Sequence, residues 1–135
     1  MNTTKWLTRL LAIGAVLESP VGLGLLVAPS PLASLLLGAS LAGTGLVVAR
    51  LAGGGLLGLG IACWFARSTP TTQAGLGVAC ALLIYNVVAS VTLALALPGP
   101  GSRALALGAA VLHGLVAVGL LVALLMRNRE VQPNH

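Results

Sequence analysis

Long apolar runs separated by short polar or proline-rich segments dominate the pattern along this chain. The runs extend over about residues 6–28, 41–65, 73–97 and 103–126. Each is longer than the roughly 20 residues that an α-helix needs to cross the hydrocarbon core of a bilayer. The sequence therefore predicts four transmembrane helices, followed by a polar tail over residues 127–135.

A shorter apolar segment lies between the first and second runs. Ser30 is suited to cap a helix whose first position is Pro31, and Gly38 is suited to end it. Such a helix is too short to span and is expected to lie in the membrane interface. The predicted fold class is all-α: an integral membrane four-helix bundle with a short interfacial helix between the first and second spans, in a single transmembrane domain over residues 1–135.

Composition supports this interpretation and excludes several classes of protein. Hydrophobic residues make up 58% of the chain and charged residues 7%, and the mean hydropathy is +1.06. A water-soluble domain carries about 25% charged residues, so this chain is not expected to be one. Four spans use nearly all of its 135 residues. No room remains for a soluble catalytic domain or a nucleotide-binding fold.

The net charge of +5 is interpreted as a signal of membrane orientation. The chain contains seven basic and two acidic residues. The basic residues lie mostly at the ends of the apolar runs and do not form a polar patch that could bind nucleic acid. An N-terminus inside the cell places five bases on the cytoplasmic side: Lys5, Arg9, Arg67, Arg127 and Arg129. Only Arg103 is then outside, so both termini are predicted to be cytoplasmic. Nucleic acid is not an expected partner.

Small residues recur at four-residue spacing in the second run. Gly45, Ala49 and Gly53 form one such row, and Gly54 and Gly58 form another. Small side chains allow helix backbones to approach closely in lipid, where no hydrophobic effect drives helices together. These rows predict close helix packing.

Each span also holds one strongly polar residue in its interior: Glu18, Arg50, Asn86 and His113. Counted from the ends of the runs at about 1.5 Å per residue, all four lie roughly 14 to 20 Å deep. A depth of this size is near the midplane of a core about 30 Å thick. The sequence therefore predicts one polar layer that joins the four helices.

Charge compensation suggests how this layer is arranged. In the interior of the spans, Glu18 is the acidic residue and Arg50 carries the guanidinium. Because a lone charge inside the membrane is costly, we expect these two side chains to pair. Asn86 and His113 are expected to satisfy the remaining donors and acceptors. Tyr85 either reaches the edge of the site or faces lipid. No catalytic residue is assigned, and a single histidine in the spans predicts neither a metal nor another cofactor.

Several functions fit such a layer. It can bind a small amphipathic or lipid-like molecule, lock the helices in register, or carry protons in a coupled carrier. It can also serve an intramembrane isomerase or cyclase that uses Glu18 and His113 as acid and base. The absence of a large head also suits an accessory or scaffolding subunit that docks on other membrane proteins or on a second copy. Whether the protein is an enzyme stays open, and the lipid bilayer is the expected partner in every case.

The layout of these residues resembles a bacterial group of small membrane proteins. The resemblance is carried by Glu18 with the following Gly22–Leu26 run and Pro29, by Ala49-Arg50, by Ala62-Cys63-Trp64, by Tyr85-Asn86 and by Leu112-His113. Together they are similar to the DoxX-like group over about residues 5 to 127. The resemblance implies a four-helix bundle in the bacterial cytoplasmic (inner) membrane and no agreed reaction. No quinone or haem motif is present, so a respiratory role is not carried over.

Overall fold

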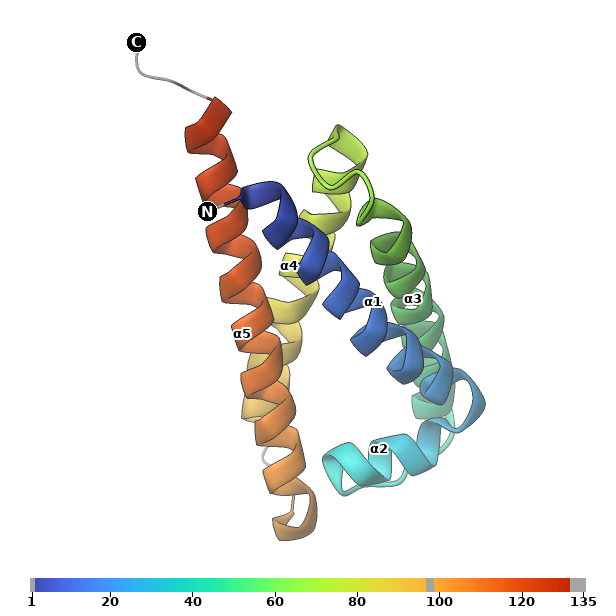
Figure 1. Cartoon of the computed structure of the whole chain (residues 1–135). Coiled ribbons are helices and arrows are strands. Elements are labelled where there is room, and N and C mark those ends of the chain that lie inside the picture. The colour runs from blue at the N-terminus through green and yellow to red at the C-terminus, as the bar shows by residue number, and fades with distance from the viewer. Residues whose placement is uncertain (1, 97–98, 132–135) are drawn as a thin grey trace.

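The computed structural model describes residues 2–96 and 99–131 of the chain. Within these ranges five helices follow one another: α1 (Thr3–Val27), α2 (Pro29–Leu37), α3 (Thr44–Ala66), α4 (Gln73–Leu95) and α5 (Pro100–Val131). Helix α1 packs along α3, α4 packs along α5, and the short α2 lies across one end of the bundle (Figure 1). The chain is therefore an all-α bundle, as predicted.

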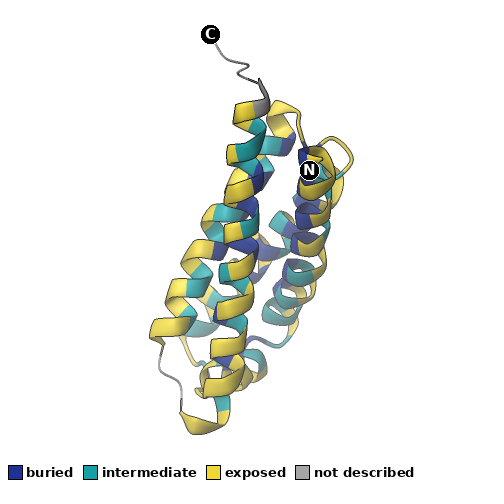
Figure 2. Cartoon of the chain, turned by 60° about the vertical axis from the view of Figure 1, so that its left-hand side comes forward, coloured by how far each residue is buried: buried dark blue, intermediate teal, exposed yellow. Residues whose placement is uncertain are grey.

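Four of these helices, α1, α3, α4 and α5, are long and apolar enough to cross a membrane. Buried residues line the interior of the bundle, while its outer faces are largely exposed (Figure 2). Large apolar side chains cover those outer faces, among them Val48, Leu51, Phe65, Ile84 and Leu95. An apolar exterior of this kind requires lipid around it. The protein is a multi-pass membrane protein, and both the predicted fold class and the short helix between the first two spans are confirmed.

Local signals explain where several helices begin and end. The side chain of Asn2 caps α1 by accepting a hydrogen bond from the backbone N–H of Lys5 (3.2 Å). Gly38, at φ +70°, ends α2 in the left-handed conformation that glycine adopts readily. Ser30 does not cap α2, because that helix already begins at Pro29. The Ser30 hydroxyl instead accepts a hydrogen bond from the N–H of Leu41 in the following loop.

Two helices differ in extent from the apolar runs. Helix α3 begins at Thr44 and not near residue 41, because the loop after Gly38 continues to Gly43. Helix α5 covers residues 100–131 and not 103–126, so the first five residues of the predicted polar tail are helical. Pro100 can open this helix because proline lacks only an N–H that the first turn does not use. Residues 97–98 of the predicted turn and residues 132–135 lie outside the described ranges.

The closest packing in the bundle joins α1 to α3. A Cβ atom added to Gly53 would lie 2.8 Å from the carbonyl oxygen of Gly22 and 2.8 Å from Cβ of Leu25. About two turns further along α3, a Cβ on Gly60 would collide with the backbone and hydroxyl of Ser19 on α1. Only glycine fits at these positions. The small-residue prediction therefore holds for Gly53, which forms a glycine seam between the two helices together with Gly22 and Gly60. It does not hold for Gly54 and Gly58, where an added Cβ would meet nothing within 4 Å.

The remaining contacts bring α4 and α5 against α1. Leu82 of α4 fills a notch at Gly14 of α1, where an added Cβ would lie 2.5 Å from Cδ2 of the leucine. Leu10 of α1 packs in the same way near Gly119 of α5. Large buried side chains of the core share this region: Leu7, Leu10, Leu11, Leu82, Val116 and Leu120. Three helices are thus held at a fixed height relative to one another.

Candidate functional site

Glu18 is buried in the middle of this three-helix contact. It lies one turn beyond Gly14 on the same face of α1, and its side chain is 2% exposed. Its oxygen Oε1 has no hydrogen-bond partner among the described residues. A buried carboxyl oxygen without a donor is costly, and more so in hydrocarbon, where water cannot compensate.

Asn86 reaches the same level from α4. It lies one turn beyond Leu82, so the leucine in the Gly14 notch places the asparagine beside Glu18. Asn86 is fully buried, and its Nδ2 donates a hydrogen bond to the carbonyl of Leu82 (2.8 Å). That bond turns its carbonyl oxygen Oδ1 toward α5.

His113 of α5 completes the group. Its Nδ1 lies 2.8 Å from Oδ1 of Asn86. A carbonyl oxygen only accepts hydrogen bonds, so the imidazole carries its proton on Nδ1 and donates it. In the neutral ring, Nε2 then holds the free lone pair. Asn86 therefore selects the tautomer of His113 and makes Nε2 the acceptor that remains available.

Glu18 and His113 are close but do not form a direct hydrogen bond. Glu18 Oε1 lies 4.0 Å from His113 Nδ1, which is beyond hydrogen-bond distance. Tyr85 borders this pair, and its ring meets the imidazole edge to face at 5.7 Å between centroids. The site thus joins residues from α1, α4 and α5, namely Glu18, Tyr85, Asn86 and His113.

Arg50 is not part of this group, and the predicted Glu18–Arg50 pair is wrong. The arginine side chain is exposed, and the basic side chain that lies within 4.0 Å of the Glu18 carboxyl in the described ranges is His113. Helix register explains the difference. Gly60 of α3 packs against Ser19, and Arg50 precedes Gly60 by ten residues, or about 15 Å along the helix.

The predicted depth of Arg50 failed because it was counted from residue 41. Helix α3 begins at Thr44, so Arg50 lies six residues, about 9 Å, from the helix start. In its place α3 brings Cys63 near the site. The Cys63 side chain is fully buried and lies about one turn beyond Gly60, which packs on Ser19. Sequence reasoning missed this residue, because a lone cysteine in an apolar run looks like ordinary core.

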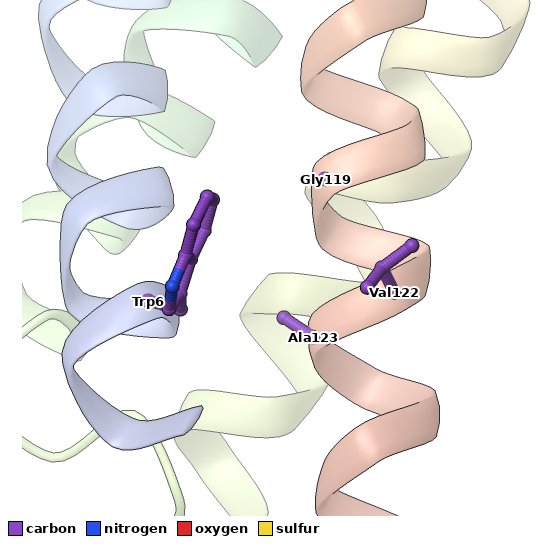
Figure 3. A pocket seen from close by; sticks show the side chains of 4 residues that line it. All are labelled: Trp6, Gly119, Val122 and Ala123. Atoms are coloured by element: carbon purple, nitrogen blue, oxygen red, sulfur yellow. The ribbon is translucent and has the colours of Figure 1, made fainter. Parts of the chain in front are cut away.

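An apolar pocket lies away from the polar site, between the N-terminal end of α1 and the C-terminal half of α5. It has a volume of about 210 Å³ and is lined by Trp6, Gly119, Val122 and Ala123 (Figure 3). Trp6 precedes Glu18 by twelve residues, about 18 Å along α1. The pocket offers almost only hydrocarbon contacts, and none of the residues that line it belongs to the polar site.

The chemical capacity of the polar site follows from its groups. It presents a carboxyl oxygen without a donor and an imidazole Nε2 with a free lone pair, beside the ring of Tyr85. Within residues 2–96 and 99–131, no three His, Cys, Asp or Glu side chains gather in a way that would hold a metal ion. Such a site can bind a polar group that donates hydrogen bonds, or exchange a proton with it.

No protein-family model, no curated protein and no solved structure matches this chain. Function is therefore argued from the site itself.

Proposed function

We propose that this membrane protein binds a lipid-like molecule through a hydroxyl or amine group held at Glu18 and His113. The observation that carries the proposal is the buried Glu18 Oε1, which has no partner and lies 4.0 Å from His113 Nδ1. A purely structural cluster would be expected to close such a gap, because leaving a buried acceptor unpaired costs about 1–3 kcal/mol. A donor group from a ligand removes that cost.

Access to the site supports the same conclusion. The side chain of His113 is 15% exposed, whereas Glu18 and Asn86 are enclosed. A ligand that arrives from the lipid meets the imidazole first, and Nε2 is the ring atom left free to accept its hydrogen bond. The exposed apolar faces of α4 and α5 suit a hydrocarbon body. The ligand class is therefore an amphipathic molecule with one small polar donor.

The test is to identify what the protein retains on purification. Wild type is extracted in mild detergent, and bound lipids are released and analysed by mass spectrometry. We expect one hydroxylated or aminated lipid-like species to be enriched over bulk lipid, and to be lost from His113→Phe and Glu18→Leu. Ser90→Ala is the matched control, because it removes a hydrogen bond between the same two helices, α4 and α5, one turn from Asn86 and His113. Equal lipid content in all four proteins would refute the proposal.

An intramembrane isomerase or cyclase is the second candidate. It is favoured by the fixed tautomer of His113, which leaves Nε2 as a base, and by the Glu18 carboxyl, an acid whose Oε1 lies 4.0 Å from Nδ1 of the same ring. Its test is conversion of the retained molecule on incubation with fresh protein. We expect Glu18→Gln to abolish conversion while binding persists. Full conversion by this variant would exclude the acid role.

The accessory-subunit and carrier alternatives rest on weaker support. The apolar outer faces are compatible with docking on another membrane protein or on a second copy, and a strictly monomeric protein without partners in mild detergent would count against the first. For a proton-coupled carrier, four helices are few without a second copy. Proton uptake into vesicles that is identical for wild type and Glu18→Gln would exclude it.

We also propose that this protein is a DoxX-like membrane protein with the orientation that its basic residues predict. The orientation is supported by the bases at one end of the bundle, where α1 begins and α3 and α5 end (Figure 1): Lys5, Arg9, Arg67, Arg127 and Arg129. Arg103 lies at the opposite end, at the start of α5. Both termini are proposed to be cytoplasmic in a bacterial inner membrane. Reporter fusions at each terminus test this, and a periplasmic signal from either would contradict it.

A further inference from the structure

Arg50 occupies an unusual place for a charged residue. It is exposed on α3, inside a membrane-spanning segment, and forms no ion pair or hydrogen bond within the described ranges. Gly54 and Gly58 follow it at four-residue spacing on the same face of the helix. A Cβ atom added to either glycine would meet nothing within 4 Å. The arginine thus stands at one end of an open, shallow stripe on the outside of the bundle.

The depth of Arg50 suits contact with the polar headgroups. Helix α3 has 23 residues and is about 35 Å long, slightly longer than a hydrocarbon core of about 30 Å. Arg50 lies about 9 Å from the start of the helix, so it is about 6 Å below the membrane boundary when the helix is centred in the core. A long arginine side chain at this depth extends toward the interface while its methylene groups stay in lipid. Its guanidinium therefore reaches the level of lipid phosphates.

Among residues 2–96 and 99–131, no carboxylate is placed to neutralise the arginine. The chain contains two acidic residues. Glu18 is buried against α4 and α5, about 15 Å from the level of Arg50. Glu130 comes near the end of α5, at the end of the bundle opposite to the start of α3 (Figure 1). A second copy of the chain, side by side in the same orientation, carries these acids at the same unsuitable heights.

We infer that the α3 stripe of Arg50, Gly54 and Gly58 binds an anionic phospholipid. The guanidinium pairs with the lipid phosphate through charge-assisted hydrogen bonds. One acyl chain lies along the glycines, where the absence of side chains lets it approach the helix backbone. This surface is on the outside of α3 and is independent of the proposed site at Glu18 and His113, so either can fail without the other.

The test uses native mass spectrometry of detergent-purified protein titrated with one of two lipids. The probes are phosphatidylglycerol and phosphatidylcholine with identical palmitoyl and oleoyl chains. Wild type is expected to retain phosphatidylglycerol about fivefold more tightly than phosphatidylcholine. Arg50→Gln is expected to abolish this preference, and Arg50→Lys to keep part of it, because lysine keeps the charge but loses the bidentate geometry.

Matched variants separate this site from general attraction to positive charge. Arg103→Gln removes a base at the same end of the bundle and is expected to leave the preference unchanged. Gly58→Leu fills the stripe without a clash in the protein and is expected to weaken binding of both lipids. An equal loss in Arg103→Gln and Arg50→Gln would overturn the inference. So would a wild-type dimer that Gly58→Leu converts to monomer, since a second helix would then occupy the stripe.

Discussion

The two sides of α1 use different chemistry to hold the bundle together. Toward α3, α1 presents Gly22 and meets Gly53 backbone to backbone. Toward α4 and α5, it presents Glu18, whose Oε1 lies 4.0 Å from His113 Nδ1 and has no hydrogen-bond partner among the described residues. Close contact between glycines is sufficient for helix association in lipid. Toward α4 and α5, the contacts of Leu82 with Gly14 and of Leu10 with Gly119 already pack the helices together. The polar group is therefore the better candidate for function.

The largest expected effect comes from breaking the glycine seam. Gly53→Leu forces a side chain into backbone that lies 2.8 Å from its Cβ, and we expect a loss of about 3 kcal/mol or more in the free energy of unfolding. Gly55→Leu is the control, because its Cβ meets nothing within 4 Å. Reversible unfolding in mixed micelles, followed by circular dichroism, measures both. Equal stability of the two variants would mean that α1 and α3 do not pack through this seam.

Asn86→Leu tests the polar side at its centre. Removing the amide leaves His113 Nδ1 without its acceptor at 2.8 Å, and we expect a loss of about 1–2 kcal/mol. The same variant frees the tautomer of the ring, which ¹⁵N NMR of labelled histidine reports directly. Wild type is expected to show protonated Nδ1, and the variant a mixture. An unchanged spectrum would contradict the role of Asn86 in selecting the tautomer.

A smaller effect is expected at the contact between α4 and α5. The Ser90 hydroxyl donates a hydrogen bond to the carbonyl of Ala110 at 2.8 Å. Bonds of this kind between membrane helices contribute about 0.6 kcal/mol on average. Ser90→Ala is therefore expected to lower the free energy of unfolding by about that amount in the same micelle assay. If Ser90→Ala lowered the free energy of unfolding as much as Asn86→Leu, the polar cluster would contribute no more to stability than an ordinary hydrogen bond between helices.

The smallest expected change in stability is that of Glu18→Leu, and it separates a binding role of Glu18 from a structural one. Glu18→Leu replaces a buried carboxyl, one of whose oxygens has no partner, with an apolar side chain of similar volume. We expect stability to be unchanged or slightly raised, as when buried charged groups are replaced by apolar ones. Loss of the retained ligand without loss of stability is the signature of a binding residue. A loss of about 3 kcal/mol or more in the free energy of unfolding would instead show that Glu18 holds the helices in register.

The sequence was most informative where a residue acts alone. Long apolar runs predicted the four spanning helices, and Gly38 predicted the end of α2, because length and local conformation need no partner. The start of α3 was less accurate, since the loop before it is also apolar. An error of three residues there displaced Arg50 toward the midplane and suggested a partner that it does not have.

Which polar residues meet was decided by tertiary structure. The sequence alone places Glu18, Asn86 and His113 inside apolar helices, because each of them stands within a long apolar run. Their meeting depends on the height and rotation of each helix, which Gly14 and Leu82 set between α1 and α4, and which Gly60 and Ser19 set between α1 and α3. Distance from a helix end cannot supply these values, because a notch at one glycine shifts a whole helix along its neighbour.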